Sequence, residues 1–343
     1  MNIILDAMSG DKAPLEIIKG ACMAVERFGD EITLVGDRAV IETIARENDL
    51  SLDRLRVEHA PGVLTMEDDP LSVVRSKKDC SMARGLQLLR DGGDAFVSAG
   101  NTGALHAGSS IMIRPIKGIH RAAIATVIPL ARPVLMLDSG ANVNVTSEYL
   151  LQWAVMGSVY MRSIYGIASP EVGLLNNGAE SHKGTPVIAD TYRKLSETPE
   201  IHFIGNVEGH QVMNAPCDVL VTDGFTGNIT LKLIEGMGKF FMGSLKSMYT
   251  KNAMTKMSFL VMKDQLKALK KQFDASEHGG APLLGLSKPV IKAHGSSDAT
   301  AICNAVRQSR AFVKTGVIAE ITAYLANNNP PKPEKEQENK HEA

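Results

Sequence analysis

The chain has 343 residues, 44% of them hydrophobic and 22% charged, and its formal net charge at pH 7 is −1. This length suits one large α/β domain or two lobes, and the composition is that of an ordinary globular protein. The near-zero charge gives no support for nucleic acid as a partner. Because no run of about 18 apolar residues exists, we expect no membrane-spanning helix.

One pattern recurs along the chain: a short apolar run is followed by small or polar residues and then by a helical stretch. The first run, residues 2–7, precedes a helix around residues 14–28, and the second, residues 31–37, leads into a helix over residues 38–48. Further strand-like runs are expected at residues 55–60, 94–100, 123–130, 133–142, 170–178, 201–209 and 217–228. The alternation predicts a three-layer α/β/α fold whose mainly parallel sheet is covered by helices on both faces.

We expect residues 1–326 to form a single large α/β domain, with two lobes divided between about Ala125 and Trp153 as the alternative. Residues 327–343 are polar and proline-rich, which predicts a disordered tail. The N-terminus lacks the basic segment of a signal peptide, so we expect a cytoplasmic protein. The cysteines stand alone, without a Cys-x-x-Cys pair or a Cys/His cluster, so we expect no metal site.

Glycine, asparagine and aspartate recur where the predicted strands end. In a parallel sheet the pocket lies beyond the carboxyl ends of the strands, so we expect these loops to share a site on one side of the sheet. A glycine followed by a helix start exposes N–H groups that bind an anion such as phosphate, whereas the alternative for each loop is an ordinary helix N-cap. The candidate side chains in these loops are Ser98, Asn101, Thr102, Asn142, Thr226 and Asn228.

Two further loops carry groups suited to acyl or phosphoryl chemistry. Lys183 lies in the glycine-flanked segment 177–186, where it can neutralise an oxyanion or hold phosphate, and a solvated surface loop is the alternative. His294, followed closely by Ser296, is a candidate acid/base or phosphate contact, with a structural histidine as the alternative. No P-loop, dinucleotide-binding glycine pattern or nucleophile elbow is present, so neither a nucleotide cofactor nor a covalent serine intermediate is indicated.

Residues 249–273 are rich in methionine and lysine, with apolar residues at helical spacing. Three interpretations remain open for this stretch. It is an interfacial helix on anionic lipid or an acidic protein, a dimer contact, or a core-facing helix with a solvated lysine face. The residues that we expect to contact a membrane or a carrier protein are Met257, Leu260, Lys263 and Lys267.

The motifs, taken in order, resemble those of the phosphate acyltransferase family over nearly the whole chain, from about Ile3 to Ala326. The matching segments are residues 6–14, 75–82, 98–105, 138–143, 156–160, 173–184, 203–209, 221–232 and 291–298. Enzymes of this family convert acyl–acyl carrier protein and inorganic phosphate to acyl phosphate. Because so many motifs occur in one order, the resemblance is specific.

The resemblance implies a fold similar to those of isocitrate dehydrogenase and phosphotransacetylase, with no cofactor and no metal. It also implies a homodimer that associates peripherally with the membrane, with a glycerol-phosphate acyltransferase acting downstream. Phosphate is itself a nucleophile and is expected to attack the thioester directly, with Asp223 orienting Lys183 or the phosphate proton. The residues expected to line the phosphate and oxyanion region are Asn101, Thr102, Lys183, Asn228 and His294.

Acyl carrier proteins are acidic, so a basic docking patch is expected, either at Arg75, Lys77 and Lys78 or along Lys263–Lys271. Two other functions remain as alternatives. One is a phosphotransacetylase-type enzyme that uses coenzyme A thioesters, and the other is a non-catalytic scaffold at the membrane surface. A scaffold has no reason to leave so many polar strand ends open, which favours an enzyme.

Overall fold

The computed structural model describes residues 1–130, 132–252, 254–255, 257, 259, 262–263, 265–266 and 279–328, without the side chains of Pro129 and Asn328. Within these residues an 11-stranded sheet runs through the molecule in the order β3-β2-β1-β4-β11-β10-β5-β6-β9-β7-β8. Its strands are β1 (Asn2–Asp6), β2 (Glu31–Gly36), β3 (Leu55–His59), β4 (Ala95–Ser98), β5 (Ala123–Pro129), β6 (Pro133–Leu137), β7 (Glu171–Asn176), β8 (His202–Glu208), β9 (Val219–Val221), β10 (Ala281–Leu284) and β11 (Val290–Lys292).

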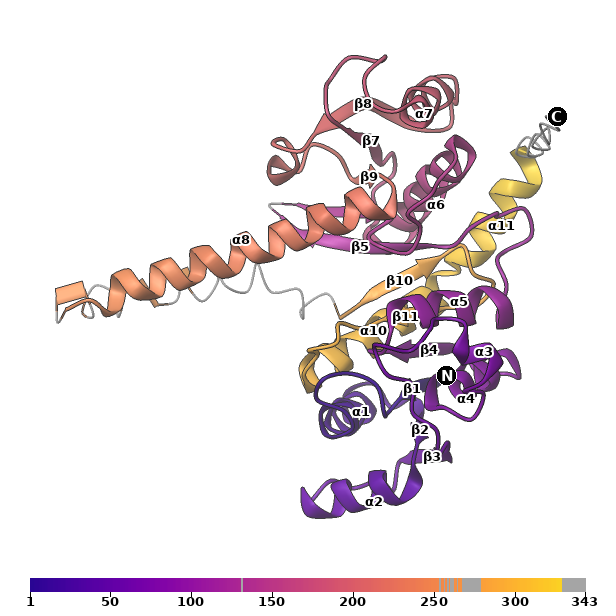
Figure 1. Ribbon diagram of the computed structural model, residues 1–343, viewed down its shortest axis with the longest axis vertical. Coiled ribbons are helices and arrows are strands. Elements are labelled where there is room, and N and C mark those ends of the chain that lie inside the picture. The colour runs from indigo at the N-terminus through magenta and orange to yellow at the C-terminus, as the bar shows by residue number, and fades with distance from the viewer. Residues whose placement is uncertain are drawn as a thin grey trace, which may run out of the picture.

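Helices cover both faces of this sheet, as Figure 1 shows. They are α1 (Leu15–Phe28), α2 (Arg38–Glu47), α3 (Ser72–Arg75), α4 (Ser81–Arg90), α5 (Thr102–Met112), α6 (Ser147–Tyr165), α7 (Pro186–Ser196), α8 (Gly224–Thr250), α10 (Ala299–Thr315) and α11 (Val317–Asn328), with a short 3-10 helix at Val212–Asn214. The expected three-layer α/β/α arrangement is confirmed.

Alternate residues of a strand belong to different apolar clusters on the two faces of the sheet, because successive side chains of a strand point to opposite faces. In β1, Ile3 and Leu5 pack with α1 and α10, whereas Ile4 packs with α4 and α5. In β6, Leu135 belongs to the cluster of α6, and Met136 belongs to the cluster that the first part of α8 covers. Burial on both faces explains why these strands appear in the sequence as continuous apolar runs.

The two halves of the sheet run in opposite directions. β3, β2, β1, β4 and β11 are mutually parallel, and so are β6, β9, β7 and β8. Between them, β10 is antiparallel to both β11 and β5, and β5 is antiparallel to β6. The strands of the two halves therefore end at opposite edges, which corrects the expectation that all the polar strand ends lie on one side of the sheet.

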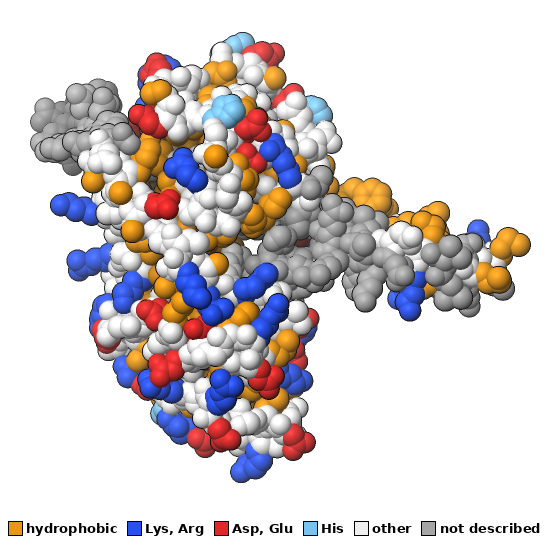
Figure 2. Space-filling view, turned by 180° about the vertical axis from the view of Figure 1, so that it is seen from behind, with side chains coloured by type: hydrophobic (Ala, Val, Ile, Leu, Met, Phe, Trp, Pro, Cys, Tyr) orange, Lys and Arg blue, Asp and Glu red, His pale blue; other side chains and the backbone are white. Residues whose placement is uncertain are grey.

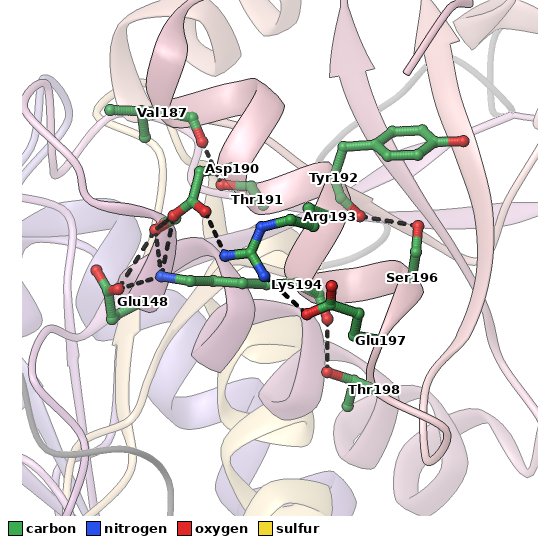
Figure 3. A network of polar contacts seen from close by, with 11 residues as sticks. Glu148, Val187, Asp190, Thr191, Tyr192, Arg193, Lys194, Ser196, Glu197 and Thr198 are labelled. Atoms are coloured by element: carbon green, nitrogen blue, oxygen red, sulfur yellow. Dashed lines mark hydrogen bonds and ion pairs between the residues drawn. The ribbon is translucent and has the colours of Figure 1, made fainter. Parts of the chain in front are cut away.

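A polar network fastens α7 onto the start of α6 (Figure 3). Lys194 forms ion pairs with Glu148 and, at 3.0 Å, with Asp190, and its Nζ also donates to Oγ of Ser147 at 2.7 Å. The hydrogen bond from Ser147, followed by those from Arg193 and Lys194, lowers the pKa of Asp190 to about 2. Asp190 is therefore ionised at neutral pH, and the network is complete there.

Helix α8 leaves the body of the molecule and projects outward (Figure 1), carrying apolar side chains into solvent along its length (Figure 2). No described helix is both long enough and apolar enough to cross a membrane. Met257 and Lys263 lie beyond the end of α8 and are exposed, with Met257 at 70%, whereas Leu260 and Lys267 lie outside the described residues. Most of the predicted tail also lies outside them, but α11 extends to Asn328.

Candidate active site

The loop after β4 rests on a buried hydrogen-bond cluster. Ser98 is 1% exposed, and its Oγ donates to Oδ2 of Asp6 at 2.7 Å and accepts from the N–H of Gly100 at 3.1 Å. Burial raises the pKa of Asp6, and hydrogen bonds from neighbouring serines, Ser98 among them, act in the opposite direction. Ser98 therefore shapes the loop from below, which corrects the expectation that its hydroxyl binds substrate.

Asn101 caps α5 and also holds the segment that precedes α3. Its Oδ1 accepts from the N–H of Ala104 at 3.1 Å, and its Nδ2 donates to the carbonyl of Met66 at 3.1 Å. Across the described parts of the chain, the N–H groups of Thr102 and Gly103 have no hydrogen-bond partner. These two groups lie at the positive end of the helix dipole and are free to donate to an anion.

The loop after β11 holds His294 against Ser296. Nδ1 of His294 lies 2.8 Å from Oγ of Ser296 and accepts from the backbone N–H of the same serine at 3.2 Å. Because Nδ1 accepts, the proton of the neutral ring resides on Nε2, which is then a donor. Burial, and then the positive charge of Lys232, lowers the pKa of His294. A neutral imidazole that donates through Nε2 suits a site where negative charge develops.

Three loops meet at this edge of the sheet and form what we call the first rim, residues 8–14, 99–103 and 293–298. β4 and β11 are parallel neighbours. The loop after β1 joins them, because the N–H of Asp11 donates to the carbonyl of Gly295 at 2.8 Å. Gly10 has a φ of 118°, and a Cβ there would lie 3.0 Å from the Cβ of Ala99, so the loops approach closely.

The second rim consists of residues 138–142, after β6, and residues 222–228, after β9. Asp138 is fully buried, and its carboxylate accepts hydrogen bonds from the backbone N–H groups of Ile124, Gly140, Ala141 and Asn142. Asn142 is also buried, and its Nδ2 donates to Oδ2 of Asp138 at 2.8 Å and to the carbonyl of Ala122 at 2.9 Å. The Nδ2 of Asn142 therefore fixes the loop, so this amide nitrogen is not available to a substrate.

Asp223 is the N-cap of α8. Its Oδ1 accepts from the N–H groups of Phe225 and Thr226, both at 2.9 Å, and its Oδ2 accepts from Oγ1 of Thr226 at 2.7 Å. The N–H of Gly224 donates to the carbonyl of Asn142, and the N–H of Gly227 donates to the carbonyl of Asp223. Since protein acceptors use all of these first-turn donors, the start of α8 is not the second anion site that the sequence indicated.

Glycines bring the start of α8 into backbone contact with the loop after β6. A Cβ on Gly227 would lie well inside contact distance of the carbonyl oxygen of Asp138. A Cβ on Gly140 would lie 3.5 Å from the Cβ and Cγ of Asn228, so the Asn228 side chain packs on this loop. Asn228 therefore belongs to the second rim.

Lys183 is exposed in the loop between β7 and α7, at the same edge of the sheet as the second rim, because β7 and β9 are parallel neighbours. Its N–H donates to the carbonyl of Glu180 at 3.1 Å, and its own carbonyl accepts from Nδ2 of Asn176 at 3.1 Å. Among the described residues its ammonium has no partner in either rim, and the predicted contact between Asp223 and Lys183 is not formed.

Two connections join the rims. Ala141, in the second rim, packs against the apolar cluster that contains Ala104 and Leu105 of α5. Helix α8 starts at the second rim, and the charges of its Lys232 and Glu235 act on the pKa of His294 in the first. Two further residues of the site, Lys292 beside His294 at the end of β11 and Asp138, could not be predicted, because a lysine in a short strand and an aspartate in a turn carry no distinctive signal.

No group of three or more His, Cys, Asp or Glu side chains that could hold a metal ion occurs in the described part of the chain. One hollow of about 500 Å³ lies at the far, amino-terminal ends of β6 and β7 and is lined in part by Arg132, Glu171 and His202. The guanidinium of Arg132 is already paired with Asp218 at 2.9 Å and with Glu171 at 3.0 Å. This hollow therefore offers no free cation for an anionic substrate.

Solved structures share this fold. A phosphotransacetylase from Streptococcus pyogenes superposes with a TM-score of 0.58 at 15% identity, covering 94% of each chain. A branched-chain phosphotransacylase from Enterococcus faecalis superposes with a TM-score of 0.53 at 14% identity, covering 91% of this chain and 100% of the other. A putative 4-hydroxythreonine-4-phosphate dehydrogenase from Salmonella typhimurium does so with a TM-score of 0.55 at 10% identity, covering 90% and 98%. Because enzymes of different chemistry share it, this likeness defines an α/β architecture of the phosphotransacetylase type and no reaction.

The family described as "Fatty acid synthesis protein" matches residues 1–320. A phosphate acyltransferase from Geobacillus thermodenitrificans is 45% identical over 329 residues, which cover 95% of this chain and 99% of that protein. A phosphate acyltransferase from Bacillus subtilis is 44% identical over 325 residues, covering 94% and 97%. The chain therefore belongs to the phosphate acyltransferase family and is an enzyme of that class.

Proposed function

We propose that this enzyme transfers the acyl group of acyl–acyl carrier protein to inorganic phosphate, releasing the free carrier protein and an acyl phosphate that feeds phospholipid synthesis. Family membership supports an acyl transfer to phosphate. The observation that carries the proposal is the first rim, where the unpartnered N–H groups of Thr102 and Gly103 adjoin the loop that holds His294 as a neutral donor. An oxyanion bound there needs no metal and no activated side chain.

In the proposed reaction a phosphate oxygen forms a bond to the thioester carbonyl carbon, and the carbonyl oxygen becomes an oxyanion. Collapse of this tetrahedral species breaks the C–S bond, and the leaving thiolate takes up a proton. Holding phosphate against the carbonyl can contribute about 7–11 kcal/mol, and one oxyanion donor contributes about 3–4 kcal/mol. Nε2–H of His294 is the donor that the geometry favours for the oxyanion.

The roles that we propose for the other predicted residues depend on the rim in which each residue lies. We propose that Thr102 binds phosphate through its N–H, that Asn101 positions this N–H as the helix cap, and that Ser296 orients His294. Asn228 is proposed to contact the substrate from the second rim, whereas Thr226 and Asp223 are proposed to act indirectly by fixing the start of α8. Lys183 is proposed to reach the substrate from the loop after β7, which lies at the same edge of the sheet as the second rim. Lys183→Ala should then lower turnover at least about tenfold, unlike its exposed neighbour Ser181→Ala, and full activity would exclude it.

The carrier protein is proposed to dock at Arg75 and Lys78, which are exposed. Lys77 is less available, because its Nζ pairs with Asp68 at 2.7 Å. Asn101 holds the carbonyl of Met66, and a Cβ on Gly103 would lie 2.9 Å from Cγ of Pro70, so this basic segment adjoins the proposed phosphate site. Most of the alternative patch, Lys263–Lys271, lies outside the described residues.

A homodimer and peripheral membrane association, with a glycerol-phosphate acyltransferase downstream, complete the proposal. The exposed apolar side chains of α8 support a protein contact, and the exposed Met254, Met257 and Phe259 beyond it support a lipid contact. Vesicle flotation of Met257→Glu on anionic vesicles tests the second of these. Unchanged flotation would remove this segment as the membrane contact.

The deciding experiment measures thiol release from acyl–acyl carrier protein with and without inorganic phosphate. We expect release only with phosphate, together with acyl phosphate as the product. Equal or faster release from acyl–coenzyme A would favour the phosphotransacetylase-type alternative. No phosphate-dependent release from either donor would overturn the proposal and favour the non-catalytic scaffold.

A further inference from the structure

Two lysines bracket the short strand β11 and make similar hydrogen bonds. At its carboxyl end, Nζ of Lys292 donates to the carbonyls of Ala99 at 3.3 Å and Ala293 at 2.5 Å. Before its amino end, Nζ of Lys288 donates to the carbonyls of Leu89 at 2.7 Å and Gly93 at 3.1 Å. Both side chains are partly buried and tie neighbouring segments together. Only Lys292 lies at the first rim, because only it follows the strand to the edge that His294 occupies.

The charge of Lys292 is not matched by a close counter-ion. In the described segments no carboxylate oxygen lies within 4 Å of its Nζ, although Asp6 and Asp11 are near enough to act on its charge. Burial lowers the pKa of Lys292 to about 8. An ammonium group in this position loses hydration without gaining an ion pair. An anionic ligand would offset this cost of desolvation. Two of its three donors are used, so one remains for such a ligand.

The ammonium group of Lys292 contacts the loop that carries the open donors of the first rim, because its Nζ bonds to the carbonyl of Ala99. Lys292 pairs in register with Ser98, which opens the loop that presents the N–H groups of Thr102 and Gly103. Through Ala99 and Ala293 it also fixes the two loops that form the rim. We propose that Lys292 contacts the phosphate substrate directly and supplies the positive charge that holds it at the first rim, an inference that rests on the proposed function.

The pH dependence of the affinity for phosphate distinguishes a direct contact of Lys292 with phosphate from a purely structural role in tying the two loops together. Lys292 is charged below about pH 8 and neutral above it, so the affinity for phosphate should fall as the pH rises through that value. The charged groups that act on it are Asp6 from β1, Asp11 from the following loop and Lys232 from α8, with His294 close by on its own loop. An arginine stays charged throughout this range, so Lys292→Arg should lose the alkaline rise in the KM for phosphate.

The experiment measures thiol release from acyl–carrier protein against phosphate concentration between pH 6.5 and 9.5, a range of about 1.5 units around the expected midpoint. Lys292→Met, Lys292→Arg and Lys288→Met are compared with the unsubstituted enzyme, and thermal unfolding checks each fold. At pH 7, Lys292→Met should raise the KM for phosphate at least about tenfold, with a smaller change in kcat. Lys288→Met loses equivalent carbonyl bonds, so it should lower thermal stability and leave this KM unchanged.

The outcomes are distinct. Without phosphate-dependent release by the unsubstituted enzyme, the proposed function itself fails. If release is phosphate-dependent but Lys292→Met keeps the KM for phosphate within about twofold, or raises it no more than Lys288→Met does, Lys292 is a brace and the inference is overturned. Should Lys292→Met not fold, the comparison of the unsubstituted enzyme with Lys292→Arg decides. Identical alkaline limbs reject the inference, and loss of the limb supports it.

Discussion

At the scale of single residues, short polar side chains at strand ends have two roles. Some form hydrogen bonds that fix the backbone of a loop, and others present a group that a substrate can contact. Both carboxylate oxygens of Asp223 and the Nδ2 of Asn142 bond to protein partners. His294 uses Nδ1 for Ser296 and leaves Nε2 available. The same residue types therefore serve either purpose, and only their hydrogen-bond partners reveal which.

The capping role of Asp223 gives a stability prediction. Asp223→Ala removes the acceptor for two N–H groups and should lower the free energy of unfolding by about 1 kcal/mol, within a range of about 0.5–2 kcal/mol. Asp223→Ser keeps a capping oxygen and should recover most of this loss. Urea unfolding of both variants measures the difference. Equal stability of the alanine and serine variants would show that the cap contributes nothing.

At the scale of elements, α8 is the helix with two different environments. Its first turns are fixed to the second rim, and further along it exposes apolar side chains at intervals of three or four residues. The exposed residues of this stripe are Phe225, Ile229, Leu233, Met237, Phe240 and Phe241. Leu233 and Phe240 are 63% and 65% exposed, which is costly for large apolar groups on a helix unless a partner covers them.

We expect a second copy of the chain to cover this stripe. Leu233→Glu combined with Phe240→Glu should weaken dimerisation by at least about 100-fold, because burying each side chain contributes about 1.5–3 kcal/mol. Lys246→Glu, also exposed on α8, changes charge without removing apolar surface and serves as the matched control. Sedimentation velocity at a series of protein concentrations measures the effect. A monomer at all concentrations before substitution would contradict the expectation.

At the scale of the whole molecule, a net charge of −1 coexists with local gatherings of Lys and Arg. Figure 2 shows such side chains in the middle of one face. A neutral protein can still attract an acidic partner when its charges are segregated, and this attraction is screened by salt. Docking of a carrier protein is therefore a property of the charge distribution and not of the total charge.

The affinity for acyl carrier protein should fall roughly tenfold when ionic strength rises from about 0.05 to about 0.3 M, because exposed charges are screened. Arg75→Glu combined with Lys78→Glu should weaken binding at low salt and remove most of this dependence. Arg56→Glu, on the edge strand β3, should leave binding unchanged. Titration calorimetry at both salt concentrations measures these affinities. Salt dependence that survives the double substitution would place the docking surface elsewhere.

Much of this architecture could be predicted from the sequence, because central strands such as β1, β4, β6 and β9 are apolar runs that are almost entirely buried. β10 and β11, of 4 and 3 residues, were not predicted. The reversal of direction around β10 and β5 leaves no local trace in the sequence either. The contact of His294 with Ser296 is local in the sequence and could be anticipated. The position of Lys292 at the site could not, because it depends on the pairing of β4 with β11.

The close contact between Gly227 and the carbonyl oxygen of Asp138 limits how the sequence can vary at position 227. The atom that a Cβ would meet belongs to the main chain, so no rotamer change can make room for it. Every substitution at Gly227 must push the helix away from the loop, whatever its polarity. Descendants of this chain must therefore retain a glycine at position 227 or lose the contact between α8 and the loop after β6.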